Sequence, residues 1–245
     1  MKKYTAGLWC AKLSLARVAA AIWCLCMLPA CNRSPDYYYP LSSGKYWRYV
    51  MTYHTMDGHF KGVYAVENLG HKKETSNVIY VRRLLDGSST FLQIDDTGIR
   101  LSGQEKTTDQ NTTRADLDRY ILQFPLVVGK EWQDTTLARA LIKTGPPQKT
   151  EFHINAQVPV TARIESLTET VAVPAGSFKD CLRVTRKGNI FTNAGNYVGL
   201  TIVNIDEIDW YAPGVGLIKS VRKEYTTSKA LDQGEITLEL EAYRR

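Results

Sequence analysis

The chain has 245 residues, of which 44% are apolar, 23% charged and 10% aromatic, and this composition excludes a chain that is disordered throughout. The formal net charge is +6, but the first 30 residues contribute four basic side chains and no acid. The rest of the chain carries 27 basic and 25 acidic side chains, a net charge of only +2. Nucleic-acid binding requires a concentrated basic surface and is therefore not expected.

The first 30 residues are predicted to be a secretory signal peptide. Lys2 and Lys3 precede an apolar run at 18–30 that ends in Pro29 and Ala30, which is the usual order of a basic region, an apolar region and a cleavage site. As a helix the run would span about 20 Å, less than the roughly 30 Å of a bilayer core. We therefore expect it to be removed rather than to span a membrane.

The segment Leu28, Pro29, Ala30 and Cys31 resembles a bacterial lipobox, although Pro29 stands where Ser, Thr or Val is more usual. The resemblance implies that Cys31 becomes the acylated N-terminus and anchors the protein in a membrane. Asn32 behind it implies retention at the bacterial outer membrane, with the domain facing the periplasm. Several acyl chains at about 0.8 kcal/mol per buried CH2 make a stable anchor. Secretion with an unmodified Cys31 is the alternative.

Cys181 is the one cysteine that we expect in the folded domain. Cys10, Cys24 and Cys26 lie in the predicted signal peptide, and Cys31 is the predicted lipid-attachment site. One remaining thiol cannot form an intramolecular disulfide. Stability must then come from the core, which a domain of about 210 residues is large enough to build.

After a polar tether at 31–36, residues 37–245 are predicted to form a single all-β domain with a curved antiparallel sheet or half-barrel. Strict alternation over 45–54, a turn at 56–58 and a returning strand at 60–66 predict a hairpin. Further strands are predicted at 78–84, 89–94, 99–101, 132–141, 158–165 and 235–242. Residues 102–119 are polar and are predicted to be a loop that ends in a short helical turn at 115–120.

One internal repeat divides this domain. Residues 39–47 and 124–132 both read aromatic-Pro-Leu-x-x-Gly-Lys-x-Trp, at a constant offset of 85 residues. The Pro suits the start of a strand, because it lacks an N–H, and the Trp is the first large inward residue of that strand. The repeat predicts two related β half-units at about 37–123 and 124–245. The alternative is a turn used twice.

Candidate catalytic and metal-binding residues are incomplete. Residues 96–98 spell the Asp-Thr-Gly of aspartic proteases, but the second copy is missing, so a hairpin turn is expected. His54 and His59 can face each other across a hairpin but lack the further ligands of a zinc site. Cys181 has no His within 25 residues that could serve as a base. We predict no enzyme activity, no metal and no cofactor.

Two further blocks lie at 173–184 (Val-Pro-Ala-Gly-Ser-Phe, then Cys) and at 210–219 (Trp-Tyr-Ala-Pro-Gly-Val-Gly), and both predict turns between strands. Together with the two Pro-Leu-x-x-Gly-x-x-Trp segments, they resemble a broad set of uncharacterised bacterial secreted and lipid-anchored proteins over most of 37–225. The resemblance implies a curved antiparallel sheet, similar to the half-barrels of periplasmic lipoprotein carriers. It implies no catalytic residue.

The predicted function is that of an outer-membrane-anchored lipoprotein whose concave face binds an apolar envelope ligand, because an apolar sheet face must be covered. Trp47, Trp132 and Trp210 are the candidate ligand-facing residues, with a place in the core as their alternative. The alternative function is a structural or assembly lipoprotein that binds another envelope protein through a strand edge. The membrane is the partner expected for lipidated Cys31.

Overall fold

The computed structural model describes residues 36–74, 77–107, 112–145 and 150–244. Over these ranges the chain consists of strands and loops and contains no helix. Residues 35–245 form one compact unit. The predicted signal peptide at 1–30, Cys31 and most of the tether lie outside the described residues.

Fourteen strands follow one another along the described residues. They are β1 (Tyr46–Thr55), β2 (Gly58–Glu74), β3 (Asn77–Leu84), β4 (Ser89–Ile94), β5 (Gly98–Thr107), β6 (Thr112–Gln123), β7 (Glu131–Leu137), β8 (Ile142–Gly145), β9 (Thr150–His153), β10 (Gln157–Val173), β11 (Gly176–Asn193), β12 (Leu200–Ala212), β13 (Gly216–Thr226) and β14 (Gln233–Arg244).

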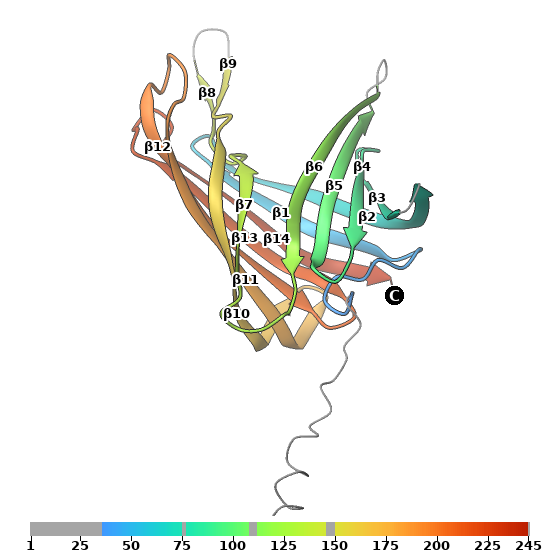
Figure 1. Ribbon diagram of the computed structural model, residues 1–245. Helices are drawn as coiled ribbons and strands as arrows, with labels where there is room; N and C mark the ends of the chain where they lie inside the picture. Colours follow the sequence, from blue (N-terminus) through green and yellow to red (C-terminus); the bar gives the residue numbers. More distant parts are fainter. Residues whose placement is uncertain (1–35, 75–76, 108–111, 146–149, 245) are drawn as a thin grey trace, which may run out of the picture. The chain divides into compact units, whose positions relative to one another are not determined.

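Twelve of the strands form one antiparallel sheet in the order β6-β5-β4-β3-β2-β1-β14-β13-β12-β11-β10-β7, while β8 and β9 form a separate hairpin. The sheet is curved but not closed, because its edge strands β6 and β7 do not pair with each other. Figure 1 shows β6 and β7 close together where residues 124–130 join them, and diverging away from that end. We call this end, which also carries the β10–β11 turn, the base. The all-β, curved-sheet prediction is confirmed.

The two halves of the sheet follow the two halves of the sequence. Strands β1–β6, from residues 37–123, occupy one continuous half, and β7 with β10–β14 occupy the other. The halves meet where β1 pairs with β14. The two repeated segments lead into β1 and β7, so each opens one half. That the half-units are related stays a prediction from the repeat.

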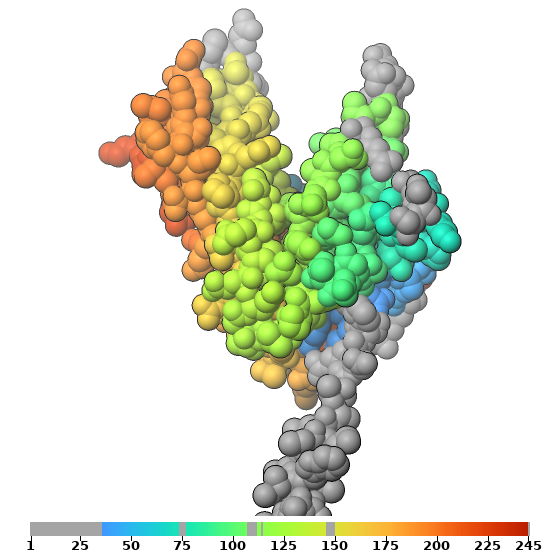
Figure 2. Space-filling model, in the orientation of Figure 1, coloured from blue at the N-terminus to red at the C-terminus, as the bar shows by residue number. Residues whose placement is uncertain are grey.

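One face of the sheet looks into its concave side. The register across β12, β13, β14, β1 and β2 aligns Glu207, Arg222, Ile236, Tyr53 and Phe60 in one row. The guanidinium in this row contacts β7 at the edge of the sheet, so we call this the inner face. Figure 2 shows the hollow that opens between the β8–β12 side and the β4–β6 side.

Three apolar clusters form the core. The first joins both halves of the sheet at the base and contains Tyr38, Ile99, Leu122, Trp132, Ala162, Ile164, Leu182, Val184 and Tyr211. The second packs residues from 138–156 onto β10 and β12. The third surrounds the start of β1 and contains Trp47, Tyr49, Val66, Cys181, Ala212, Val215, Ile218 and Leu240. Met51, Tyr53, Phe60 and Ile236, from β1, β2 and β14, belong to none of these clusters.

Most strand predictions are confirmed, including the hairpin of 45–54 and 60–66, in which Tyr49 lies opposite Tyr64. The predicted loop at 102–119 is wrong: β5 continues to Thr107, and β6 begins at Thr112. Side chains here are partly or fully exposed on both faces, so the hydrophobic alternation that marks a half-buried strand is missing. Pairing between β5 and β6 decides the structure instead.

The predicted strand at 132–141 is also longer than the observed one. β7 ends at Leu137, and residues 138–141, which we call the crossing segment, leave the sheet. The carbonyl oxygen of Ala140 lies so close to Gly234 of β14 that a Cβ there would come within 1.9 Å of it. The crossing segment therefore lies directly on the inner face, where only glycine leaves room for it.

Candidate functional site

The three candidate tryptophans lie in two apolar clusters: Trp47 belongs to the third cluster, against which Trp210 packs, and Trp132 belongs to the first. Trp47 is 3% exposed in the third cluster, and its indole Nε1 donates a 2.6 Å hydrogen bond to the carbonyl oxygen of Val215. Trp132 is 5% exposed in the cluster at the base. Trp210 lies on the opposite face of the sheet from its neighbour in sequence, the inner-face Asp209, and donates to Glu169 over 2.8 Å. Tight core contacts cover the rings of Trp47 and Trp132, which fits their alternative place in the core, whereas Trp210 is partly buried.

The inner face instead presents other apolar side chains to the hollow. Met51, Tyr53 and Ile236 are half-buried, and Phe60 is 52% exposed. They come from β1, β14 and β2, and the register places them on the inner face. We call these four residues the apolar floor. None of its members belongs to the three clusters.

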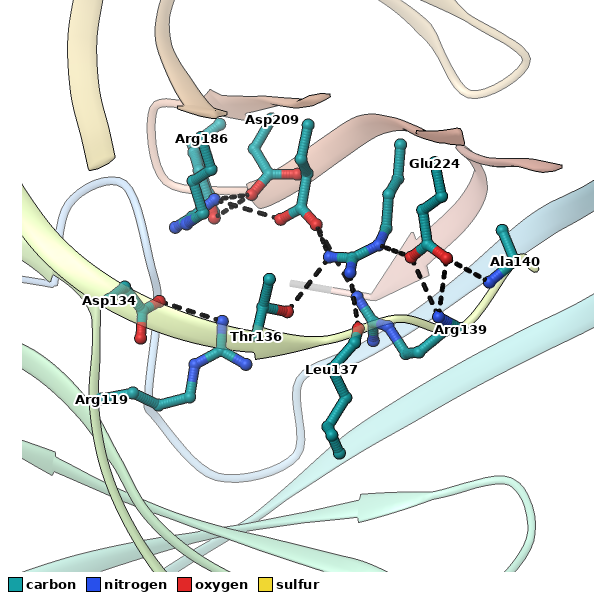
Figure 3. Close-up of polar contacts among 12 residues, drawn as sticks. Arg119, Asp134, Thr136, Leu137, Arg139, Ala140, Arg186, Asp209 and Glu224 are labelled. Carbon is teal, nitrogen blue, oxygen red and sulfur yellow. Dashed lines mark hydrogen bonds and ion pairs between the residues drawn. The ribbon is translucent and has the colours of Figure 1, made fainter. Parts of the chain in front are cut away.

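A layer of charged residues, buried except for parts of Arg119 and Arg139, lies on the inner face of the sheet (Figure 3). It combines four arginines with four carboxylates, so its formal charges balance. We call it the ionic layer; its members are Arg119, Asp134, Arg139, Arg186, Glu207, Asp209, Arg222 and Glu224. Burying this many charges is costly unless each is paired.

Glu224 fastens the crossing segment to the sheet. Its carboxylate accepts hydrogen bonds from the backbone N–H groups of Arg139 (2.8 Å) and Ala140 (2.7 Å), and it pairs with Arg222. Arg222 also donates to the carbonyl oxygen of Leu137 over 2.6 Å. These bonds replace the strand pairing that the backbone loses when β7 ends, so a carboxylate and a guanidinium satisfy the buried peptide groups.

The pKa values of the two carboxylates at the centre of the ionic layer, Glu207 and Asp209, are shifted in opposite directions. Burial alone would raise the pKa of Glu207, but Arg186 and Arg222 outweigh it and lower that pKa to about 2. Burial and the neighbouring Glu207 raise the pKa of Asp209, to which Arg186 donates a short hydrogen bond. Glu207 is thus the firmly ionised carboxylate of the pair.

The layer also links the two edges of the sheet. Arg119 of β6 pairs with Asp134 of β7 at 3.2 Å, and Arg186 of β11 donates to the carbonyl oxygen of Ile121 in β6 over 2.9 Å. Side chains therefore connect the edges where backbone pairing does not. These side-chain contacts set the distance between β6 and β7 beyond the base.

The other candidates stay apart from this site. The rings of His54 and His59 lie edge to face with centroids 4.0 Å apart, which confirms that they face each other across the hairpin. Among the described residues, no group of three or more His, Cys, Asp or Glu side chains is placed to hold a metal ion. Asp96 lies in the β4–β5 turn, which the Asp95 carboxylate caps by accepting the N–H of Thr97.

Cys181 is fully buried and is expected to be unreactive. Burial raises its pKa to about 11, so the thiolate that alkylating reagents require is scarce. In the chain carrying Cys31→Ser, we expect iodoacetamide to label Cys181 only as fast as the protein unfolds, followed by mass spectrometry with and without denaturant. Rapid labelling of the folded protein would contradict this and reopen the nucleophile alternative.

Reasoning from the sequence did not predict the ionic layer, although the sequence contains a pattern that indicates two of its members. In 201–211 the acids Glu207 and Asp209 are in phase with the buried Val203 and Ile205. Alternation assigns all four to one face, so the acids had to be buried. The partners, which come from distant strands, have no such signal.

Fold and site together define an all-β protein with an open, curved sheet and a partly exposed apolar inner surface. The chain belongs to the DUF3108-like family, whose family model matches residues 43–231. No curated protein matches the chain. The described part of the chain contains no helix with the length and hydropathy of a membrane span.

Three solved structures are similar to this chain at low identity. A candidate exported protein with a YmcC-like fold from Bacteroides fragilis has 16% identity, covers 85% of this chain and 99% of its own, and gives a TM-score of 0.38. A candidate lipoprotein from Parabacteroides distasonis has 15% identity, coverages of 85% and 98%, and a TM-score of 0.36. A candidate outer membrane lipoprotein-sorting protein domain from Vibrio parahaemolyticus has 8% identity, coverages of 84% and 86%, and a TM-score of 0.27. At TM-scores this low, the similarities carry no functional argument.

Proposed function

We propose that the protein is a lipid-anchored envelope protein that binds an apolar ligand, such as an acyl chain, on the inner face of its sheet. The observation that carries this proposal is the apolar floor, in which Phe60 is 52% exposed on the inner face. A ligand that covers such side chains gains about 25 cal/mol per Å² of apolar surface removed from water. An acyl chain gains about 0.8 kcal/mol for each CH2 that it buries.

The anchor rests on the lipobox-like segment at 28–31. Cleavage before Cys31 and its acylation would hold the domain at a membrane, and Asn32 favours the outer membrane of a bacterium. Mass spectrometry of the mature N-terminus tests this part: a diacylglyceryl Cys31 is expected, and an unmodified Cys31 in a secreted protein would contradict it.

Binding is tested with N-phenyl-1-naphthylamine, an apolar dye that fluoresces on leaving water, added to the chain carrying Cys31→Ser. We expect Phe60→Ser to weaken dye binding about tenfold, because one large side chain of the floor is lost. Val63→Ser is the matched control, since Val63 is 42% exposed on the same strand but on the opposite face. Equal dye binding by both variants, or no binding by the parent, would contradict the proposal.

A second candidate function is binding of another envelope protein. It is favoured by an exposed apolar pair on the outer face, in which Phe191 (67% exposed) lies opposite Ile202 (37%), close to Leu200 (69%). Native mass spectrometry separates the two functions. A bound lipid that Phe60→Ser removes supports the first, whereas a protein partner that Phe191→Ser removes, with no lipid, supports the second.

A further inference from the structure

Only positive groups of the ionic layer are exposed to an appreciable extent. Its four carboxylates are buried, with side-chain exposures between 0% for Glu224 and 10% for Glu207. In contrast, the side chain of Arg119 is 30% exposed and that of Arg139 is 58% exposed. Although the layer as a whole is neutral, the members of the layer that reach solvent are two guanidinium groups.

Both arginines have unused hydrogen-bonding capacity. The Arg119 Nε is buried and has no hydrogen-bond partner among the described residues, although Nη2 of the same group reaches Asp134. The Arg139 guanidinium lies 3.7 Å from Glu207, which is too far for a hydrogen bond. A guanidinium carries five N–H donors that match the oxygens of a carboxylate or phosphate.

The register relates the Arg139 guanidinium to the apolar floor: this group lies 3.7 Å from Glu207, which lies opposite Arg222 on the next strand, and Arg222 lies opposite Ile236 of the floor. Ala140, the neighbour of Arg139, touches Gly234, which stands two residues before Ile236 on the inner face of β14. Two residues along a strand correspond to about 7 Å. Arg119 reaches the same layer from β6: it pairs with Asp134 of β7, two residues before Thr136, which accepts a hydrogen bond from Arg222.

We propose that the ligand is an anionic amphiphile, whose acyl tail lies on the apolar floor and whose acidic head is bound by Arg119 and Arg139. This inference rests on the proposed function and specifies its ligand class. Carboxylate and phosphate heads share the chemistry that the two arginines recognise. A fatty acid and a phospholipid are therefore the two sources to be distinguished.

The test compares three probes with the same saturated tail: palmitate, hexadecyl phosphate and the uncharged hexadecanol. Each is used to displace N-phenyl-1-naphthylamine from the chain carrying Cys31→Ser, below the concentration at which the probe aggregates. Charge-assisted hydrogen bonds predict that at least one anionic probe binds about tenfold more tightly than hexadecanol, or better. A preference for palmitate identifies a fatty acid, and a preference for hexadecyl phosphate identifies a phospholipid-type head.

Arg139→Gln is expected to abolish the preference for the anion and to leave the affinity for hexadecanol unchanged. The substitution keeps the backbone N–H that Glu224 holds, so the crossing segment stays in place. Arg163→Gln is the matched control, because Arg163 is 49% exposed and lies on the outer face. This control is expected to retain the preference.

The outcomes separate the inference from the function on which it rests. If all three probes bind equally, or if Arg139→Gln weakens all three equally, the inference is overturned while apolar binding stands. If none of the probes displaces the dye and the dye itself does not bind, the proposed function fails. A preference for the anion that survives Arg139→Gln also overturns the role of this residue.

Discussion

Replacing Glu224 with Gln is expected to lower the free energy of unfolding by about 3–5 kcal/mol, the usual cost of removing one partner from a buried ion pair. Glu224 is 1% exposed and accepts hydrogen bonds from Arg222 and from the backbone of Arg139 and Ala140. Gln supplies one acceptor oxygen and one NH2 group. Because all the partners are donors, the NH2 group must face at least one of them with no bond formed.

The control for this prediction is Glu235→Gln, the same substitution on the neighbouring strand. Glu235 pairs with Lys223 at 3.6 Å, and their side chains are 32% and 62% exposed. The pair is solvated, so a change within about 0.5 kcal/mol is expected. Denaturant unfolding measures both variants. Hydrogen exchange should also show faster exchange at the amides of Arg139 and Ala140 in Glu224→Gln alone, and equal effects of the two substitutions would contradict the role of Glu224.

The ionic layer is better understood as a positioning device than as a source of net stability. Desolvation of buried charges offsets much of their attraction, and well-packed apolar residues are often as stabilising. Apolar side chains could not satisfy the peptide groups of Leu137, Arg139 and Ala140, which Arg222 and Glu224 do. The charges therefore hold the crossing segment at one place on the inner face and leave the apolar floor open beside it.

Local patterns predicted much of the fold. Residues 235–242 alternate strictly and lie within β14, and the strands predicted at 78–84 and 89–94 match β3 and β4. Period-two alternation works here because one face of these strands is buried. The repeated segment placed Trp47 and Trp132 as the first buried side chains of β1 and β7, which the structure confirms.

Features that depend on contacts between distant strands could not be predicted. β6 has no apolar alternation over its first residues and exists through its pairing with β5. The register at Cys181 is reset by bulges in β10 and β11, so Cys181 and Leu182 are both buried although they are neighbours. The backbone partners of Glu224, which are Arg139 and Ala140, lie about 85 residues away in sequence, and no local pattern identifies them.

The sequence predicted that the candidate site is an apolar concave face, but it did not predict which residues line that face. A concave apolar face follows from strand alternation, and Met51 and Tyr53 share the predicted face with Trp47. Burial along that face differs, however, because the base is closed by other strands and the far end is open. The curvature of the sheet decides which residues of one alternating row lie in the core and which lie in the apolar floor. Alternation in the sequence does not predict this curvature.

Trp47→Ala is expected to cost about 3–5 kcal/mol of unfolding free energy while leaving dye binding by the folded protein unchanged. The indole is 3% exposed, Arg82 lies over its ring at 4.9 Å, and the Nε1 bond to Val215 is lost with it. Trp47→Phe retains most of the buried surface and loses the hydrogen bond, so a smaller loss of about 1–2 kcal/mol is expected.

Phe60→Ser should show the reverse pattern, with weakened dye binding and little change in unfolding free energy, because its ring is already 52% exposed. Denaturant unfolding and dye titration at a temperature where every variant is folded measure both quantities on the same samples. If Trp47→Ala weakens dye binding as strongly as Phe60→Ser does, Trp47 belongs to the ligand wall and the division of the inner face into core and floor is wrong. If binding survives, the aromatic residue at the start of β1 holds the sheet together at its base, and the ligand is bound beyond it.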